Sequence, residues 1–147
     1  DLNNKYISEL DYIFASFHRI PSGRKNDYIK TSQINKINFE RVAKKWFIAF
    51  KNALVNPNVS GILHPTSVFK HKKEKISTKT LKMLAKIAHE NNKILEFNVK
   101  HDVPHLLFKK IIKKEGGLIS IGSDSHSVRE LKNNRDKVKL LNKRVYF

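Results

Sequence analysis

The chain has 147 residues, a length that fits one domain or part of one, and 39% of them are hydrophobic. It contains no cysteine, which excludes disulfides and thiolate metal sites and leaves His and carboxylate side chains as metal ligands. No apolar run reaches the roughly 20 residues that span a bilayer, and no signal-peptide pattern opens the chain. We therefore expect a cytoplasmic protein without membrane contact.

The net charge of +17 at pH 7 has two interpretations. Lysine accounts for 24 of the 30 basic residues and is scattered beside many Asn and Ile residues, which is typical of solvated Lys-rich surfaces. Lys and Arg also neutralise phosphates and release counterions when a protein binds a polyanion. The charge therefore leaves attraction to nucleic acid or to phosphorylated substrates as the alternative.

Four short apolar runs alternate with helical patterns along the chain. The runs have the β-branched and aromatic content of buried strands and span residues 11–17, 59–63, 94–97 and 118–121. Strands that alternate with amphipathic helices form a parallel sheet with helices packed over it. The sequence thus predicts an α/β fold of parallel βα repeats within one domain.

The first two helices are predicted from apolar spacing and from an N-cap. Apolar residues recur at helical spacing over residues 39–54, and Ser77 is a suitable N-cap for the second helix. The basic stretches at residues 19–36 and 70–75 precede these two helices. We interpret both stretches as loop insertions within the same domain.

The last two helices have clear end signals. The third is predicted to begin near residues 102–104, with Pro104 in its first turn, and to stop at Gly116. Ser127 and Glu130 have the spacing of a capping box at the start of the fourth.

Each predicted strand ends in side chains that can bind a metal or accept hydrogen bonds. The carboxyl ends of parallel strands face a common crevice, so residues far apart in sequence are expected to become neighbours there. Imidazole nitrogen and carboxylate oxygen are ligands that Zn, Mn and Fe accept. In chain order these residues are His18, His64, Glu96, Asn98, Asp124 and His126.

Each of these residues also has a structural interpretation. A single His after a strand is more often a hydrogen-bonded loop residue than a ligand. Glu96 could be a buried carboxylate with hydrogen-bond partners, and Asn98 could hold the strand end by an Asx-type bond. His101 and His105 follow the third strand near a helix N-terminus, where a substrate phosphate could bind. Because four strand ends share this feature, the combination favours a site over four separate structural roles.

Four motifs in order carry a resemblance to a known family. They are DYIFASFH at residues 11–18, ILHP at 62–65, LEFN at 95–98 and IGSDSH at 121–126. Over residues 11–131 the sequence resembles the PHP (polymerase and histidinol phosphatase) superfamily of metal-dependent phosphoesterases. Family patterns of Ser-x-His, His-Pro, Glu-x-Asn and Gly-Ser-Asp-x-His correspond to these four motifs.

The resemblance implies part of a distorted (β/α)7, TIM-like barrel with up to three divalent metal ions, Zn, Mn or Fe, at its C-terminal face. A metal-activated hydroxide would hydrolyse a phosphate ester there, as in histidinol phosphatases. His18 and His64 would hold one ion, Asp124 another and His126 a third, with Asp124 and His126 also catalytic. Glu96 and Asn98 would line the base of the site, and substrate contacts are assigned to Asn98, His101 and His105.

The chain departs from the family pattern in its first part. The family's early His-x-His motif and a metal-bridging Glu have no counterpart, and four strands cannot close a seven-stranded barrel. We therefore expect residues 1–147 to form a single PHP domain without its N-terminal strands, the missing half being lost or supplied by another chain. Weak metal binding and little or no turnover are expected from this chain alone.

Several functions compete. Hydrolysis of a phosphorylated small molecule is the leading hypothesis, and the +17 charge supports a nuclease or a DNA-polymerase-associated PHP domain as the alternative. A degenerate, non-catalytic PHP module is a third possibility. Amidohydrolase-like barrels also place His and Asp at strand ends, but they often use a metal-bridging Lys, and no Lys ends a predicted strand here.

Overall fold

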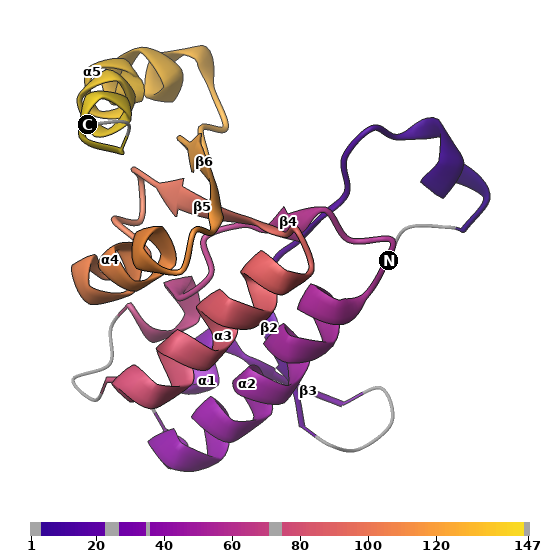
Figure 1. Cartoon of the computed structure of the whole chain (residues 1–147). Helices are drawn as coiled ribbons and strands as arrows, with labels where there is room; N and C mark the ends of the chain where they lie inside the picture. Colours follow the sequence, from indigo (N-terminus) through magenta and orange to yellow (C-terminus); the bar gives the residue numbers. More distant parts are fainter. Residues whose placement is uncertain (1–3, 23–26, 35, 71–74, 146–147) are drawn as a thin grey trace.

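A four-stranded parallel sheet forms the centre of the molecule. The computed structural model describes residues 4–22, 27–34, 36–70 and 75–145. The sheet has the order β1 (Phe14–Ala15), β4 (Gly61–Ile62), β5 (Ile94–Asn98) and β6 (Leu118–Gly122), of which Figure 1 labels β4, β5 and β6. All three neighbouring pairs are parallel. The predicted α/β fold with parallel βα repeats is confirmed.

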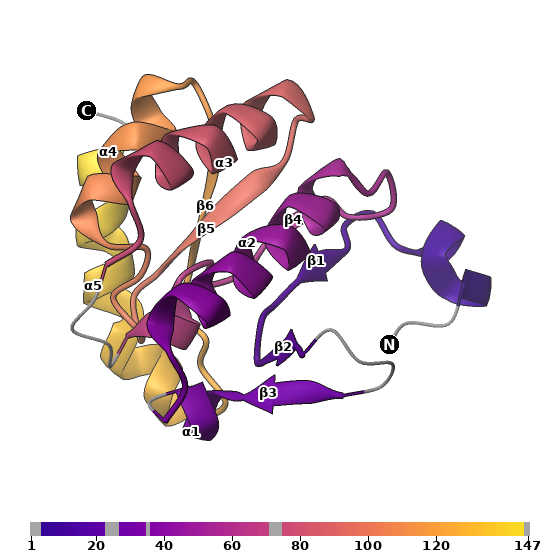
Figure 2. The ribbon, with the colours of Figure 1, turned by 90° about the horizontal axis from the view of Figure 1, so that it is seen from below.

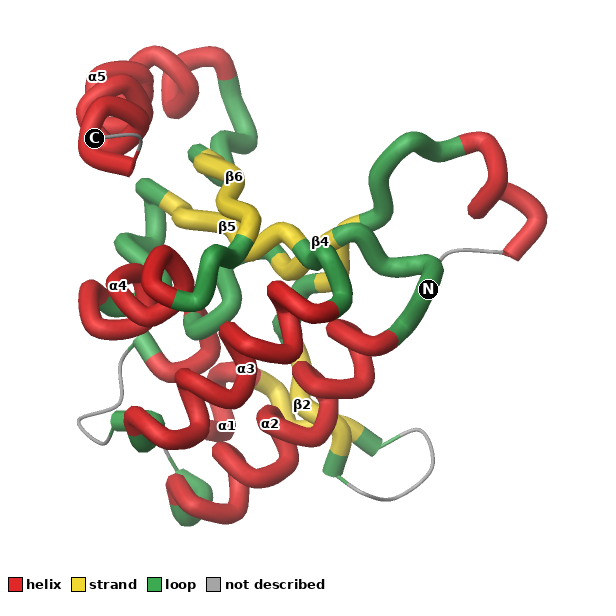
Figure 3. The backbone as a smooth tube through the Cα atoms, in the orientation of Figure 1, coloured by secondary structure: helices red, strands yellow, loops and turns green. Residues whose placement is uncertain are grey.

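Helices connect these strands. Three of them, α2 (Phe39–Val55), α3 (Thr78–Glu90) and α4 (Leu106–Lys114), lie side by side on one face of the sheet (Figures 1 and 3). The last helix, α5 (Val128–Val145), follows β6 and lies apart from those three. Two short 3-10 helices, η1 (Asn4–Glu9) and η2 (Ser67–Phe69), complete the main elements. No helix in the described ranges is long and apolar enough to cross a membrane.

Two of the predicted strands are shorter in the structure than in the sequence analysis. The run at residues 11–17 contributes only the two residues of β1, and the run at 59–63 only the two of β4. The Ile13 backbone N–H donates to the Ser60 side-chain oxygen at 3.1 Å instead of joining a ladder. The Ser60 backbone N–H still donates to the Ile13 carbonyl at 2.7 Å, so pairing is irregular at this end and the regular register begins at Phe14 and Gly61.

The predicted loop at residues 19–36 is wrong for its described part. It contains an antiparallel hairpin, β2 (Arg19–Pro21) and β3 (Tyr28–Lys30), followed by the short α1 (Thr31–Ile34), and Figure 2 shows the hairpin beside α2. Each of the three elements buries an isoleucine in the core: Ile20, Ile29 and Ile34. In both strands one buried residue lies between two exposed ones, which is too short a pattern to indicate a strand. Residues 71–74 of the second predicted loop lie outside the described residues.

The helix N-termini confirm one prediction and correct another. Ser77 caps α3, with its hydroxyl accepting from the Thr80 N–H at 3.2 Å. By contrast, α4 begins at Leu106 with His105 as N-cap, so the prediction that Pro104 lies in its first turn is wrong. Val103 exchanges two backbone hydrogen bonds with Asn98. The chain is therefore extended at Val103, and the helix starts only after it leaves this bridge.

The core lies between the sheet and the helices and is rich in aromatic rings. Trp46 and Phe50 on α2 are fully buried, and their ring centroids lie 5.1 Å apart. Phe17, just after β1, stacks on Phe50 at 5.5 Å, and Phe69 of η2 meets Trp46 at 5.2 Å. These contacts anchor the chain segments that immediately precede His18 and follow His64, which positions both histidines.

Candidate functional site

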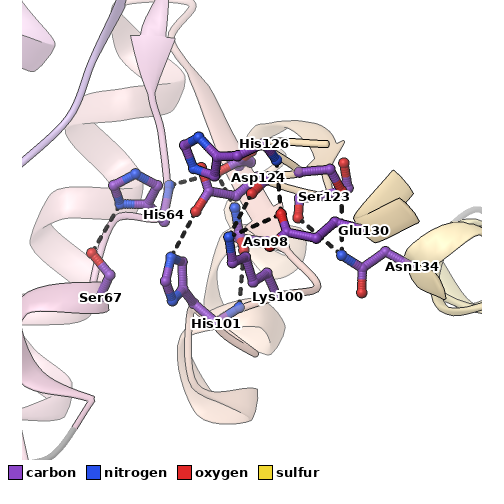
Figure 4. A network of polar contacts seen from close by, with 12 residues as sticks. His64, Ser67, Asn98, Lys100, His101, Ser123, Asp124, His126, Glu130 and Asn134 are labelled. Atoms are coloured by element: carbon purple, nitrogen blue, oxygen red, sulfur yellow. Dashed lines mark hydrogen bonds and ion pairs between the residues drawn. The ribbon is translucent and has the colours of Figure 1, made fainter. Parts of the chain in front are cut away.

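The carboxyl ends of the strands bring the predicted histidines together. His64 follows β4, His101 follows β5, and Asp124 and His126 follow β6 (Figure 4). The His64 ring centroid lies 5.1 Å from that of His18 and 5.6 Å from that of His101. Histidines from three different strand ends therefore line one small region, as the strand-end pattern predicts.

Asp124 is the centre of this group. Its Oδ2 lies 2.8 Å from His101 Nε2, and its Oδ1 lies 3.5 Å from His126 Nε2. The Asp124 side chain is 26% exposed, whereas that of His126 is 73% exposed. One carboxylate thus joins a half-buried imidazole on one side to a solvent-facing imidazole on the other. We refer to His18, His64, His101, Asp124 and His126 as the histidine cluster.

Two residues of the histidine cluster have unusual backbone angles. His64 has a φ of 31° and Asp124 a φ of 46°, both in the left-handed region that non-glycine residues seldom adopt. Such conformations cost on the order of 1–3 kcal/mol each and persist where surrounding contacts hold them. Backbone strain at two strand ends that meet is typical of a functional site.

Glu96 lies under the cluster and supports it. It is 6% exposed, and its Oε2 accepts from the His64 backbone N–H at 2.6 Å and from Asn98 Nδ2 at 3.1 Å. Its side chain passes over Gly122 on the neighbouring strand, where an added Cβ would overlap the carboxyl group. Glu96 is thus a buried carboxylate with hydrogen-bond partners, one of the two roles expected for it, and it lies directly beneath His64.

Asn98 directs His101 toward Asp124. Its Oδ1 accepts from the His101 backbone N–H at 3.0 Å, and its backbone pairs with Val103 across the intervening turn. Asn98 itself is 1% exposed. His105 has a different place from His101: as N-cap of α4, its Nδ1 accepts from the Leu107 N–H at 3.4 Å. A substrate role for any of these three residues remains a prediction.

Two residues outside the predicted site, a lysine and a glutamate, hold the loop after β6. Lys100 Nζ donates to the Asp124 carbonyl at 3.1 Å and to Glu130 Oε2 at 3.3 Å. Glu130 Oε2 also accepts from the His126 N–H at 2.8 Å, and these contacts lower the Glu130 pKa. The Ser127 hydroxyl accepts from the Glu130 N–H, which confirms half of the predicted capping box. The Glu130 carboxylate binds Lys100 and the His126 N–H instead of the Ser127 N–H that a capping box requires, so this half of the prediction is wrong.

The electrostatics of the cluster favour a neutral imidazole beside a charged carboxylate. Burial lowers the pKa of His64, although the charge of Glu96 opposes this shift. Burial alone would raise the pKa of Asp124, but the hydrogen bond and charge of His101, together with His64 and His126, bring it below the usual range. His64 Nδ1 lies 2.9 Å from the Ser67 hydroxyl, so Nε2 is the ring nitrogen that this contact does not engage. Neutral imidazole and ionised carboxylate are the forms that bind metals.

In metal-free protein, His64 should stay neutral to a lower pH than an ordinary histidine. Its folded pKa lies below the usual value of 6.5, so the unfolded chain takes up this proton first as the pH falls. The stability that neutral His64 contributes to the fold is fully present above about pH 6.5 and is lost as the pH falls through the pKa of His64 in the folded chain. NMR titration of the histidine Cε1–H signals in a chelator, with His64→Gln for assignment, measures it. A His64 midpoint at or above 6.5 would contradict the expectation.

No model of a protein family, no curated protein and no solved structure matches this chain.

The side chains of the histidine cluster are of the types that bind first-row transition metals. Imidazole nitrogens and a carboxylate suit Zn, Mn and Fe. Two ligands of a tetrahedral zinc ion lie about 3.3 Å apart, because each bond is about 2.0 Å long. The distance from Asp124 Oδ2 to His101 Nε2 is shorter than this, at 2.8 Å, and the distance from Asp124 Oδ1 to His126 Nε2 is longer, at 3.5 Å. The two pairs use different carboxylate oxygens, and the described part of the chain contains no group of three His, Cys, Asp or Glu residues that could hold one ion.

Proposed function

We propose that this chain is a metal-dependent phosphoesterase domain of the PHP type, acting on a phosphorylated small molecule. The observation that carries the proposal is the histidine cluster itself. Its four histidines and one aspartate come from the ends of four adjacent parallel strands. Parallel α/β folds bind ligands at this edge of the sheet. The proposal includes the finer fold, in which the sheet is part of a distorted (β/α)7 barrel.

The residues of this chain have distinct parts in the proposal. His18 and His64 would hold one ion, and Asp124 and His126 would contribute to others, with His101 as a further ligand next to Asp124. Bound divalent ions supply water activation and offset the charge of a phosphate group. Lys100 and Glu130 hold the Asp124 and His126 backbone in place, and Asn98 does the same for His101.

Replacing Asp124 with asparagine tests this proposal. We expect weak Mn²⁺ or Zn²⁺ binding by the chain, and a loss of about 100-fold or more in affinity in Asp124→Asn, since supporting groups alone contribute 10–100-fold. Isothermal titration calorimetry measures the affinity, and hydrolysis of an aryl phosphate is the second readout. Asp136→Asn, on the exposed surface of α5, is the matched control and should bind as the parent chain does.

Two outcomes would count against a phosphoesterase. Equal metal affinity in the parent chain and in Asp124→Asn would show that the histidine cluster is not the metal site. Metal binding that depends on Asp124 but neither tightens the binding of a phosphate ester nor supports its hydrolysis would instead support a non-catalytic PHP module.

Nucleic acid is a second candidate substrate or partner because the chain carries a net charge of +17. Binding to phosphate backbones weakens steeply as salt rises, since condensed counterions are released on association. Affinity for single-stranded DNA is therefore measured between 50 and roughly 200 mM salt, where a polyanion-binding protein loses about 10³–10⁵ in affinity. A shallow salt dependence would favour the small-molecule substrate.

A further inference from the structure

A pocket of about 380 Å³ borders the histidine cluster at His101. It lies between η2, the first turns of α3 and the start of α4. Its deeper lining is apolar and closely packed, with exposed fractions of 0–8% for Phe69, Leu81, Val103 and Phe108. Small-molecule sites commonly have volumes of about 300–1,000 Å³ and mostly apolar walls with a few polar groups. The pocket has the size and the lining of such a site.

The pocket and the histidine cluster share a wall. His101 lines the pocket, and its Nε2 is hydrogen-bonded to Asp124 (Figure 4). Thr66, which also lines the pocket, follows His64 by two residues. A small molecule in the apolar pocket therefore contacts the histidine cluster at His101.

The rim of the pocket carries positive charge. Lys70 and Lys75 both line it. Asp102 is the acid among the described lining residues; its side chain is 92% exposed and pairs with Lys109 at 3.3 Å. Because that ion pair offsets the acid, the two lysines favour a ligand that carries negative charge.

We propose that this pocket holds the apolar organic group of a phosphate monoester whose phosphate lies at His64, His101 and Asp124. The inference rests on the proposed function and narrows its substrate class to monoesters of an aromatic or other apolar alcohol. The hydroxyl groups of a sugar phosphate would lose water against Phe69 and Phe108 without gaining hydrogen bonds. Hydrolysis adds water across the P–O bond and releases inorganic phosphate and the alcohol, which leaves with a proton.

Binding of three probes by the chain tests the assignment. Calorimetric titrations use 1-naphthyl phosphate, glycerol 2-phosphate and inorganic phosphate, each with and without Mn²⁺. We expect 1-naphthyl phosphate to bind at least about tenfold more tightly than the other two, since its ring buries apolar surface. Mn²⁺ should tighten its binding in the parent chain but not in Asp124→Asn, because the two ligands then share a site.

Three variants separate the pocket from the metal site. Thr66→Phe should fill the pocket and reduce 1-naphthyl phosphate affinity by about tenfold or more. Leu107→Asn, at a lining residue that is 42% exposed, should weaken it several-fold without risk to the fold. Leu106→Asn is the matched control: the neighbouring residue is 60% exposed, does not line the pocket and should change nothing.

The outcomes distinguish this inference from the proposed function. Equal affinity for all three probes, with binding dependent on Mn²⁺ and Asp124, would overturn the pocket assignment and leave the metal site intact. Binding of 1-naphthol as tight as that of 1-naphthyl phosphate, independent of Asp124, would also overturn it. Selective 1-naphthyl phosphate binding that is lost in Thr66→Phe and Leu107→Asn but without metal uptake would support the pocket and refute the phosphoesterase.

Discussion

Replacing Gly122 with alanine should lower the free energy of unfolding by about 3 kcal/mol or more. The three heavy atoms nearest to an added Cβ all belong to the Glu96 side chain, and the Cβ would overlap its Oε1. Because Glu96 is buried and fixed by two hydrogen bonds, it can move only by releasing the His64 and Asn98 donors. Urea unfolding measures the loss. Ser120→Ala, two residues earlier on the same face of β6, is the control and should change stability by less than about 1 kcal/mol.

A double-mutant cycle assigns this loss to Glu96. If the clash with Glu96 is the cause, adding Gly122→Ala to Glu96→Ala should cost little, so the two substitutions should couple by about 2–3 kcal/mol. Additive losses would mean that Gly122 is required for another reason, and our account of how the sheet supports His64 would be wrong. The cycle is informative at modest stability because it compares differences between folded variants.

The second large effect is expected for Asn98→Asp, a substitution of nearly equal shape. At pH 7 it places a second carboxylate 3.1 Å from Glu96 Oε2 in a position that is 1% exposed. We expect a loss of about 3 kcal/mol in the free energy of unfolding, since like charges without solvent repel strongly. Asn133→Asp, on the exposed surface of α5, is the matched control and should stay within about 0.5 kcal/mol.

The loss in Asn98→Asp should depend on pH in a defined direction. Burial and the Glu96 charge raise the pKa of the new carboxyl in the folded state above its unfolded value of about 3.9. The deficit relative to the parent chain is therefore full above the folded pKa and shrinks as the pH falls through it. A protonated carboxyl also restores a donor to Glu96. A deficit that is the same at pH 7 and pH 4 would show that repulsion is not its cause.

Local sequence patterns predict most of the elements that hold the site. The apolar spacing over residues 39–54 becomes α2, the Ser77 cap begins α3, and each strand-end motif lies next to a strand of the parallel sheet. These features depend on side-chain periodicity and on hydrogen bonds within a few residues. Such interactions are the same in any fold that contains the segment, which is why the sequence indicates them.

The pairing inside the site depends on contacts between distant segments. His101 reaches Asp124 because the Asn98–Val103 bridge closes the turn between them. Glu96 lies under His64 because the strand register places Gly122 opposite Asn98. Lys100 and Glu130 are 30 residues apart and meet only when β5 and β6 lie side by side. In the sequence, Lys100 is one of 24 lysines, and Glu130 has a sufficient local explanation as a cap.

For the histidine cluster, the sequence by itself determined which residue types follow the strands and that parallel pairing would bring them to one edge. Only the tertiary structure decided the hydrogen-bond partners of Asp124, the buried carboxylate beneath His64 and the pocket beside His101. The physical reason is that strand type follows from short-range preferences. Register, turn geometry and cavity shape instead depend on how whole elements pack, where a shift of one residue would turn each side chain to the opposite face.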